Sequence, residues 1–185
     1  GIICTDATYH GNSAEVSKLT GAKSNQGDVR SIRFPETYRT DTEDPLNHHL
    51  RELQLVIESF REDGTPFAGM LVCPILANEG LPNIPKGYMA EAAKIVHQAG
   101  GVFMADEVQA GLCRTGMWWG YQTMGVVPDI VTMGKPLGGG IPLAATAAST
   151  DGLDARNARR RHGSTGGGQE CPGYPDPPAT CDASC

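Results

Sequence analysis

The sequence predicts an α/β fold, a mostly parallel β-sheet with helices flanking both faces. The first observation is a series of short apolar runs that lack the strict alternation typical of strands with one solvated face. The second is that helical patterns separate several of these runs, as in sheets built from β-α-β units. The third is that polar residues follow three strand ends, where parallel sheets gather their ligands.

Five segments are expected to form strands, because each is short, apolar and bounded by polar residues or glycine. They are residues 1–4, 70–76, 102–105, 129–133 and 143–149.

Two longer segments are expected to form helices. Over residues 44–62, apolar side chains recur at spacings of three and four with charged residues between them, and Asp44 suits the N-cap position. A second helix is expected to begin at Pro85 and to stop at the glycines of positions 100–101.

Composition excludes several classes of protein. With 39% hydrophobic residues among 185, the chain can bury a core, and its net charge of −6 disfavours nucleic-acid binding. No apolar run approaches the roughly 18 residues of a membrane span, and no signal-peptide pattern begins the chain. A cytoplasmic or mitochondrial location is therefore expected. Because the first residue is Gly1 rather than Met, the chain is interpreted as a fragment of a longer product.

The composition changes near residue 150. Residues 151–185 contain ten Gly or Pro, and their only large aliphatic residue is Leu153. Such a segment buries too little apolar area to offset the entropy lost on ordering. The sequence therefore predicts a globular part over residues 1–150 and a disordered Gly/Pro/Cys-rich tail over residues 151–185.

Cysteines are present in both parts of the chain. Cys4, Cys73 and Cys113 lie in or beside apolar runs and form no CxxC pair, so buried free thiols are expected. The tail carries His162 and the cysteines Cys171, Cys181 and Cys185. Their spacing lacks the short ligand pairs of structural zinc sites, and no metal is predicted.

Asp106 ends one predicted strand and Lys135 follows another, which suggests two kinds of chemistry. A magnesium-binding Walker B strand could end at Asp106, but nucleotide hydrolysis also requires a Walker A loop. That loop needs Ser or Thr directly after its lysine, whereas Lys135 is followed by Pro136. Nucleotide hydrolysis is therefore disfavoured.

Pyridoxal-phosphate chemistry is the other interpretation. It needs a lysine that forms a Schiff base with the cofactor aldehyde, and an acid that keeps the pyridine nitrogen protonated. Lys135 and Asp106 supply these groups, and the ring of Tyr9 could stack on one face of the cofactor.

Three segments resemble one family, the class-III pyridoxal-phosphate aminotransferases of fold type I. Residues 101–116, GVFMADEVQAGLCRTG, resemble the family's DEVQxGxxRTG signature. Residues 128–143, PDIVTMGKPLGGGIPL, resemble its PDIVTxGKxxGGGxPL lysine segment, and residues 9–13, YHGNS, resemble its YHGxS/T turn. The order and spacing of the three segments also fit, over roughly residues 1–150.

The resemblance implies a role for five residues toward pyridoxal 5'-phosphate. Lys135 would be the Schiff-base lysine and then the base that moves the substrate's α-proton, and Asp106 would pair with the pyridinium nitrogen. Val108 and Tyr9 would cover the two faces of the ring, and Gln109 would bind its phenolic oxygen.

His10 lies in the same turn as Tyr9 and is assigned to the cofactor site, as a hydrogen-bonding residue of the turn rather than a catalyst. One departure from the family concerns Cys73, which stands where the family usually carries Glu before Pro. Two others are a phosphate-binding turn expected upstream of this chain and the loss of the family pattern after Ser149.

The resemblance implies transfer of an amino group from an amino acid or amine to a 2-oxo acid or aldehyde. The subgroup of the family that this chain resembles includes alanine–glyoxylate aminotransferase 2-like enzymes. The same subgroup contains phospho-lyases that act on amino-phosphates, and this alternative stays open. A non-catalytic remnant that binds no cofactor is the third interpretation. The family implies a homodimer in the full-length form.

Overall fold

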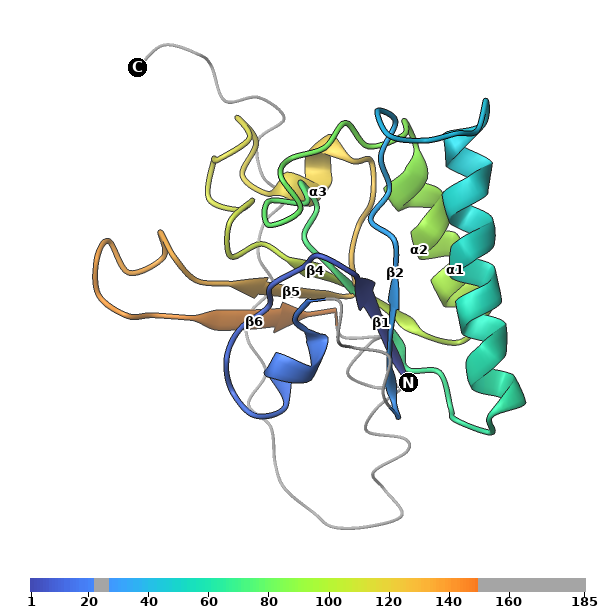
Figure 1. Ribbon diagram of the computed structural model, residues 1–185. Helices are drawn as coiled ribbons and strands as arrows, with labels where there is room; N and C mark the ends of the chain where they lie inside the picture. Colours follow the sequence, from blue (N-terminus) through green and yellow to red (C-terminus); the bar gives the residue numbers. More distant parts are fainter. Residues whose placement is uncertain (22–26, 150–185) are drawn as a thin grey trace.

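The computed structural model describes residues 1–21 and 27–149, so the tail predicted at residues 151–185 lies outside the described residues. Six strands form one sheet in the order β2-β1-β3-β4-β5-β6 (Figure 1). The strands are β1 (Ile2–Thr5), β2 (Val29–Ile32), β3 (Gly69–Val72), β4 (Val102–Asp106), β5 (Ile130–Met133) and β6 (Ala145–Ala148). The helical segments are η1 (Val16–Leu19, a 3-10 helix), α1 (Pro45–Glu62), α2 (Tyr88–Gln98) and α3 (Gly120–Thr123).

The predicted fold class is confirmed, because β1 to β5 pair in parallel and only β6 runs antiparallel to its neighbour. All five predicted strands are present within a few residues of their expected bounds. Strand β2 is not among the predicted strands, because its centre is the polar pair Arg30 and Ser31 and its apolar signal is correspondingly weak. Strand β2 forms because it pairs with β1 along its whole length.

Both predicted helices form, and local chemistry sets their ends. The Asp44 carboxylate accepts the Asn47 backbone N–H at 3.1 Å, which caps α1 as expected. The start of α2 lies three residues after Pro85, because Gly87 adopts a left-handed conformation with φ 85° that cannot continue a helix. Within the described residues, neither helix nor any other is long and apolar enough to cross a membrane.

The core lies between the sheet and one helical layer. Helices α1 and α2 contact each other and pack side by side on the same face of the sheet (Figure 1). Their apolar faces meet the central strands through fully buried side chains, among them Leu53, Phe60, Met70, Tyr88 and Phe103. Within residues 1–21 and 27–149, the other helical segments, η1 and α3, have four residues each.

One expectation about the thiols is also wrong. Cys4 and Cys73 are buried, but Cys113 is exposed. Its apolar neighbour Leu112 and Cys113 itself adopt left-handed conformations, with φ of 58° and 65°, in the turn after β4. An apolar neighbourhood in the sequence does not bury a residue when the backbone turns outward at that point.

Strands β3 and β4 pack closely at Gly69. A Cβ atom at Gly69 would lie 2.2 Å from the carbonyl oxygen of Val102, so only glycine fits there. The register that follows along β4 and β5 sets Asp106 directly opposite Thr132. The carboxyl end of β4 therefore lies beside the carboxyl end of β5, and Lys135 follows two residues after β5 ends.

Candidate active site

The carboxyl ends of β1, β3, β4 and β5, with the loops that follow them, surround a small cavity. Its lining residues are Tyr9, His10, Cys73, Asn78, Asp106, Val108, Gln109 and Lys135. All six residues predicted for the site lie in this lining, although four separate segments of the chain supply it. The remaining two, Cys73 and Asn78, come from the loop after β3.

A larger cavity of about 460 Å³ lies at the opposite, amino-terminal edge of the sheet. It is lined by Gly27, Arg30, Asp63 and Thr65. Arg30 and Asp63 pair with each other there, so both charges of that cavity are neutralised. The smaller cavity is the better site because it gathers an amine, a buried carboxylate and an amide.

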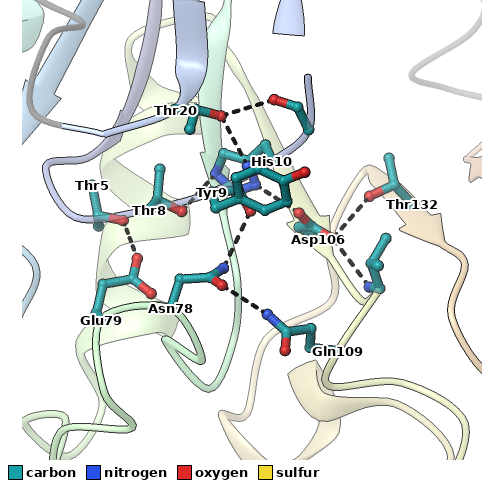
Figure 2. Close-up of polar contacts among 12 residues, drawn as sticks. Thr5, Thr8, Tyr9, His10, Thr20, Asn78, Glu79, Asp106, Gln109 and Thr132 are labelled. Atoms are coloured by element: carbon teal, nitrogen blue, oxygen red, sulfur yellow. Dashed lines mark hydrogen bonds and ion pairs between the residues drawn. The ribbon is translucent and has the colours of Figure 1, made fainter. Parts of the chain in front are cut away.

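Asp106 lies at the base of the site and is only 7% exposed. Its Oδ2 atom is 2.6 Å from Nδ1 of His10, and its Oδ1 atom accepts the backbone N–H of Val108 at 3.0 Å (Figure 2). The hydroxyl of Thr132 lies 3.4 Å from the same Oδ1. Three donors from three segments thus orient a buried carboxylate, which is how proteins stabilise a charge away from water.

His10 connects Asp106 to a second polar group. Because a carboxylate only accepts hydrogen bonds, Nδ1 of His10 carries the proton in this contact. The Thr8 hydroxyl lies 3.1 Å from Nε2 on the other side of the ring, and the His10 side chain is 1% exposed. The expectation of a residue that bonds within its own turn is therefore incomplete, because the structure also makes His10 the partner of Asp106.

Lys135 follows β5 and is exposed at the mouth of the cavity. Within the described residues its amine forms no ion pair. Val108 lies next to the lysine turn, since a Cβ atom at Gly134 would be 3.5 Å from both of its methyl groups. Val108 thus packs between the Asp106 turn and the Lys135 turn.

Tyr9 and Gln109 lie on either side of Asn78. The Tyr9 residue is 44% exposed and lines the cavity. The Asn78 amide donates to the Tyr9 carbonyl oxygen at 3.2 Å and accepts from Nε2 of Gln109 at 3.0 Å (Figure 2).

Cys73 contributes a neutral, buried group to the lining. Burial raises the pKa of its thiol to about 11, although hydrogen bonds from the backbone N–H groups of Ala77 and Ile75 act to lower it. The thiol therefore stays protonated at neutral pH. Cys73 therefore presents an uncharged side chain to the cavity.

Glu107 follows Asp106 but faces away from the cavity. Its two carboxylate oxygens accept the backbone N–H groups of Gly120 and Tyr121, each at 2.8 Å, and the residue is 1% exposed. Burial raises the pKa of this carboxyl, although the same two N–H groups act in the opposite direction. Glu107 fixes the start of α3 to the end of β4.

The cavity thus brings a buried carboxylate, an amine and a side-chain amide together at one edge of the sheet. A family model described as "Aminotransferase class-III" matches residues 1–171, which is most of the chain. The chain belongs to the class-III aminotransferase family. The match agrees with the three segments whose residues line the cavity. It extends to residue 171, so the expectation that the family pattern is lost after Ser149 is wrong.

Individual relatives of this chain differ in their named activities. The chain is 36% identical over 174 residues to "Alanine--glyoxylate aminotransferase 2 homolog 2, mitochondrial" of Arabidopsis thaliana, covering 90% of this chain and 35% of that protein. It is 31% identical over 160 residues to a leucine/methionine racemase of Thermococcus litoralis, covering 80% of this chain and 36% of that protein. The chain thus spans about a third of the length of these curated relatives.

A solved structure of a phospholyase from Arthrobacter, in complex with phosphoethanolamine, is also similar. It superimposes with a TM-score of 0.78 at 34% identity, covering 86% of this chain and 40% of that one. The described sheet and helices are therefore part of a class-III, fold-type-I architecture.

Sequence reasoning missed the residues that support the site from outside the motifs. Thr8 precedes the Tyr9 turn, Thr132 lies inside β5, and Asn78 stands in a loop that reads as an ordinary turn. Thr8 and Thr132 could have been found, because each lies within three residues of a predicted site residue or opposite one in parallel register. Asn78 carried no such signal.

Proposed function

We propose that this chain is part of the cofactor-binding large domain of a pyridoxal-phosphate enzyme that transfers amino groups. The domain would cover residues 1–150, as the sequence analysis expected. The proposed substrates are an amino acid or amine as donor and a 2-oxo acid or aldehyde as acceptor. Similarity to a relative named aminotransferase supports the reaction class.

The residues present fit pyridoxal phosphate by the chemistry of their donor set. A pyridine nitrogen needs an acid, an aldehyde needs a primary amine, and a phenolic oxygen needs an N–H donor. Asp106, Lys135 and Gln109 supply one of each around a single cavity. Bound there, the cofactor would supply a protonated ring that takes up the electron pair released when a substrate C–H bond breaks.

Asp106 would hold the proton on the pyridine nitrogen. Its carboxylate is already oriented by His10 and by the Val108 N–H, so little reorganisation is needed when a cationic ring arrives. Lys135 would hold the cofactor at its aldehyde and, once the substrate amine has released it, would move a proton at the α-carbon of the substrate. Its exposed amine can reach a group at the cavity mouth.

Three further residues would position the ring. Tyr9 would cover one face and Val108 the other, which excludes water from the reacting atoms. Gln109 would donate its amide N–H to the phenolic oxygen. His10 would act through Asp106, by donating to the carboxylate that binds the ring nitrogen.

The full-length protein is proposed to be a homodimer, with small molecules as its other partners. A mitochondrial or cytoplasmic location is proposed as well, since the Arabidopsis thaliana relative is named mitochondrial.

The observation that carries the proposal is that Asp106 and Lys135, from adjacent parallel strands, line one cavity. The test is to incubate the chain with pyridoxal phosphate, reduce it with borohydride and map the labelled peptide by mass spectrometry. Lys135 should carry the label. A Lys135→Ala variant should lose it, whereas Lys86→Ala, which removes another exposed lysine, should keep it.

Equal labelling of Lys135 and of other exposed lysines would contradict the proposal. Absence of labelling would favour the alternative that the chain is a non-catalytic remnant.

A second candidate is elimination of phosphate and ammonia from a small amino-phosphate. The observation that favours it is the similarity to the Arthrobacter phospholyase, whose structure holds phosphoethanolamine. The two reactions are separated by their products. Release of inorganic phosphate from phosphoethanolamine without an oxo acceptor indicates the lyase, and formation of a new amino acid that requires the acceptor indicates the transferase.

A further inference from the structure

We infer that Asn78 is a positioning residue that fixes which edge of the Gln109 side-chain amide faces the cavity. Asn78 Nδ2 donates to the backbone carbonyl oxygen of Tyr9 at 3.2 Å. Its Oδ1 accepts from Nε2 of Gln109 at 3.0 Å. Figure 2 shows the Asn78 amide between the two, joining loops that follow β1, β3 and β4.

The Tyr9 carbonyl oxygen sets the donor-to-acceptor direction of both hydrogen bonds. The Tyr9 carbonyl oxygen can only accept, so Asn78 must turn its NH2 group toward it. The Asn78 oxygen then points to Gln109, which must present its own NH2 group in turn. A half-turn of either amide would bring two acceptors together at one contact, losing a hydrogen bond and adding repulsion.

The loop that carries Asn78 is held in a defined shape. The Leu81 N–H donates to the Leu76 carbonyl oxygen at 3.0 Å, which closes the loop around Asn78. The Leu76 side chain is fully buried in the core. Asn78 therefore projects from an anchored turn, although its own side chain is exposed.

The link to the cofactor rests on the proposed function. Gln109 Nε2 has two hydrogens, and Asn78 takes one of them. The second stays available for an acceptor in the cavity, such as the phenolic oxygen of pyridoxal phosphate. If Gln109 were free to rotate, its carbonyl oxygen would face that oxygen part of the time and repel it.

The first test needs no cofactor. The side-chain amide of Gln109 is followed by 15N–1H NMR in the whole chain, in Asn78→Ala and in Asn83→Ala. Asn83 is the matched control, because its Nδ2 donates to the Thr37 hydroxyl at 3.1 Å and it does not line the cavity. In the parent and the control, the two Gln109 amide protons should differ in hydrogen exchange.

In Asn78→Ala, exchange at the bonded Gln109 proton should accelerate to the rate of its free neighbour. Unchanged exchange in that variant would overturn the inference.

The second test is a double-mutant cycle on the affinity for pyridoxal phosphate, with Asn78→Ala and Gln109→Ala alone and together. Asn78→Ala should weaken binding roughly three- to tenfold, as expected for one net hydrogen bond. It should have no further effect once Gln109 is alanine. Equal losses in both backgrounds would mean that Asn78 does not act through Gln109 and would overturn the inference.

The two failures are distinguishable. If the parent takes up no pyridoxal phosphate at Lys135, the proposed function fails, and the NMR comparison alone then decides whether Asn78 orients Gln109.

Discussion

The Glu107 carboxylate accepts the backbone N–H of Gly120 at 2.8 Å, across thirteen positions of sequence and entirely inside the protein. This contact joins the end of β4, where Asp106 lies, to the start of α3. The turn that carries Val108 and Gln109 is closed between these two points. The position of the site residues after β4 therefore depends on a carboxylate that does not itself face the cavity.

Substitution of Gly120 by alanine should destabilise the protein, because the space beside it is full. A Cβ atom there would lie 2.5 Å from Cβ of Ala110 and 3.1 Å from a carboxylate oxygen of Glu107. Overpacking of this kind costs about 1–3 kcal/mol, to be measured by urea unfolding. Gly134→Ala is the control, since its added Cβ would make only ordinary contacts of 3.5 Å with Val108. Equal stability of the two variants would contradict the packing argument.

The raised pKa of Glu107 should make stability depend on pH. Burial raises that pKa above its ordinary value of 4.5. A carboxyl with a higher pKa in the folded state contributes stability below pH 4.5, and this is lost as the pH rises through the raised pKa. Glu107→Gln has no titrating carboxyl at this position, so the variant does not lose stability in this way as the pH rises. The free energy of unfolding of the variant minus that of the parent should therefore increase as pH rises from 4.5, and a constant or falling difference would refute the assignment.

Removal of His10 should destabilise the fold as well as the site. Its ring donates to the buried Asp106 carboxylate at 2.6 Å, and His10→Ala leaves Oδ2 of that carboxylate without its partner. A buried acceptor that loses its donor costs about 1–3 kcal/mol, measurable by chemical denaturation. His48→Ala, at an exposed position of α1, should change the free energy of unfolding by less than about 0.5 kcal/mol. If both variants unfold alike, His10 does not support Asp106.

The parts of the site that the sequence predicted are those encoded locally. Asp106 and Lys135 stand at the ends of apolar runs, and parallel strands bring such ends to one edge of the sheet. No knowledge of the loops was needed for that prediction. The strand β2 was missed for the opposite reason, since Arg30 and Ser31 hide a pairing that depends on β1.

Asn78 and Glu107 show what the sequence pattern cannot predict. Each acquires its role from partners on other segments, Asn78 from Tyr9 and Gln109, and Glu107 from the start of α3. An asparagine in a loop or an acid after a strand has many local uses, and only the tertiary arrangement selects one.

Asp106→Asn should separate the fold from the chemistry. The amide oxygen can still accept the Val108 N–H, and the amide nitrogen can donate to Nδ1 of His10. His10 then carries its proton on Nε2, where the Thr8 hydroxyl can accept it. Because every hydrogen bond has a substitute, we expect the free energy of unfolding to change by less than about 1 kcal/mol.

What Asp106→Asn removes is the negative charge beside the pyridine nitrogen. An adjacent carboxylate favours a protonated, cationic ring, so its loss should lower the pH at which bound pyridoxal phosphate loses its ring proton by about 1–3 units. The measurement is the absorbance of the bound cofactor as a function of pH, in the parent, in Asp106→Asn and in Asp129→Asn. Asp129 is the control because its carboxylate lies at the amino-terminal end of β5, bonded to His97 and to the Phe103 N–H. A titration midpoint that is the same in all three proteins would mean that Asp106 does not contact the pyridine nitrogen.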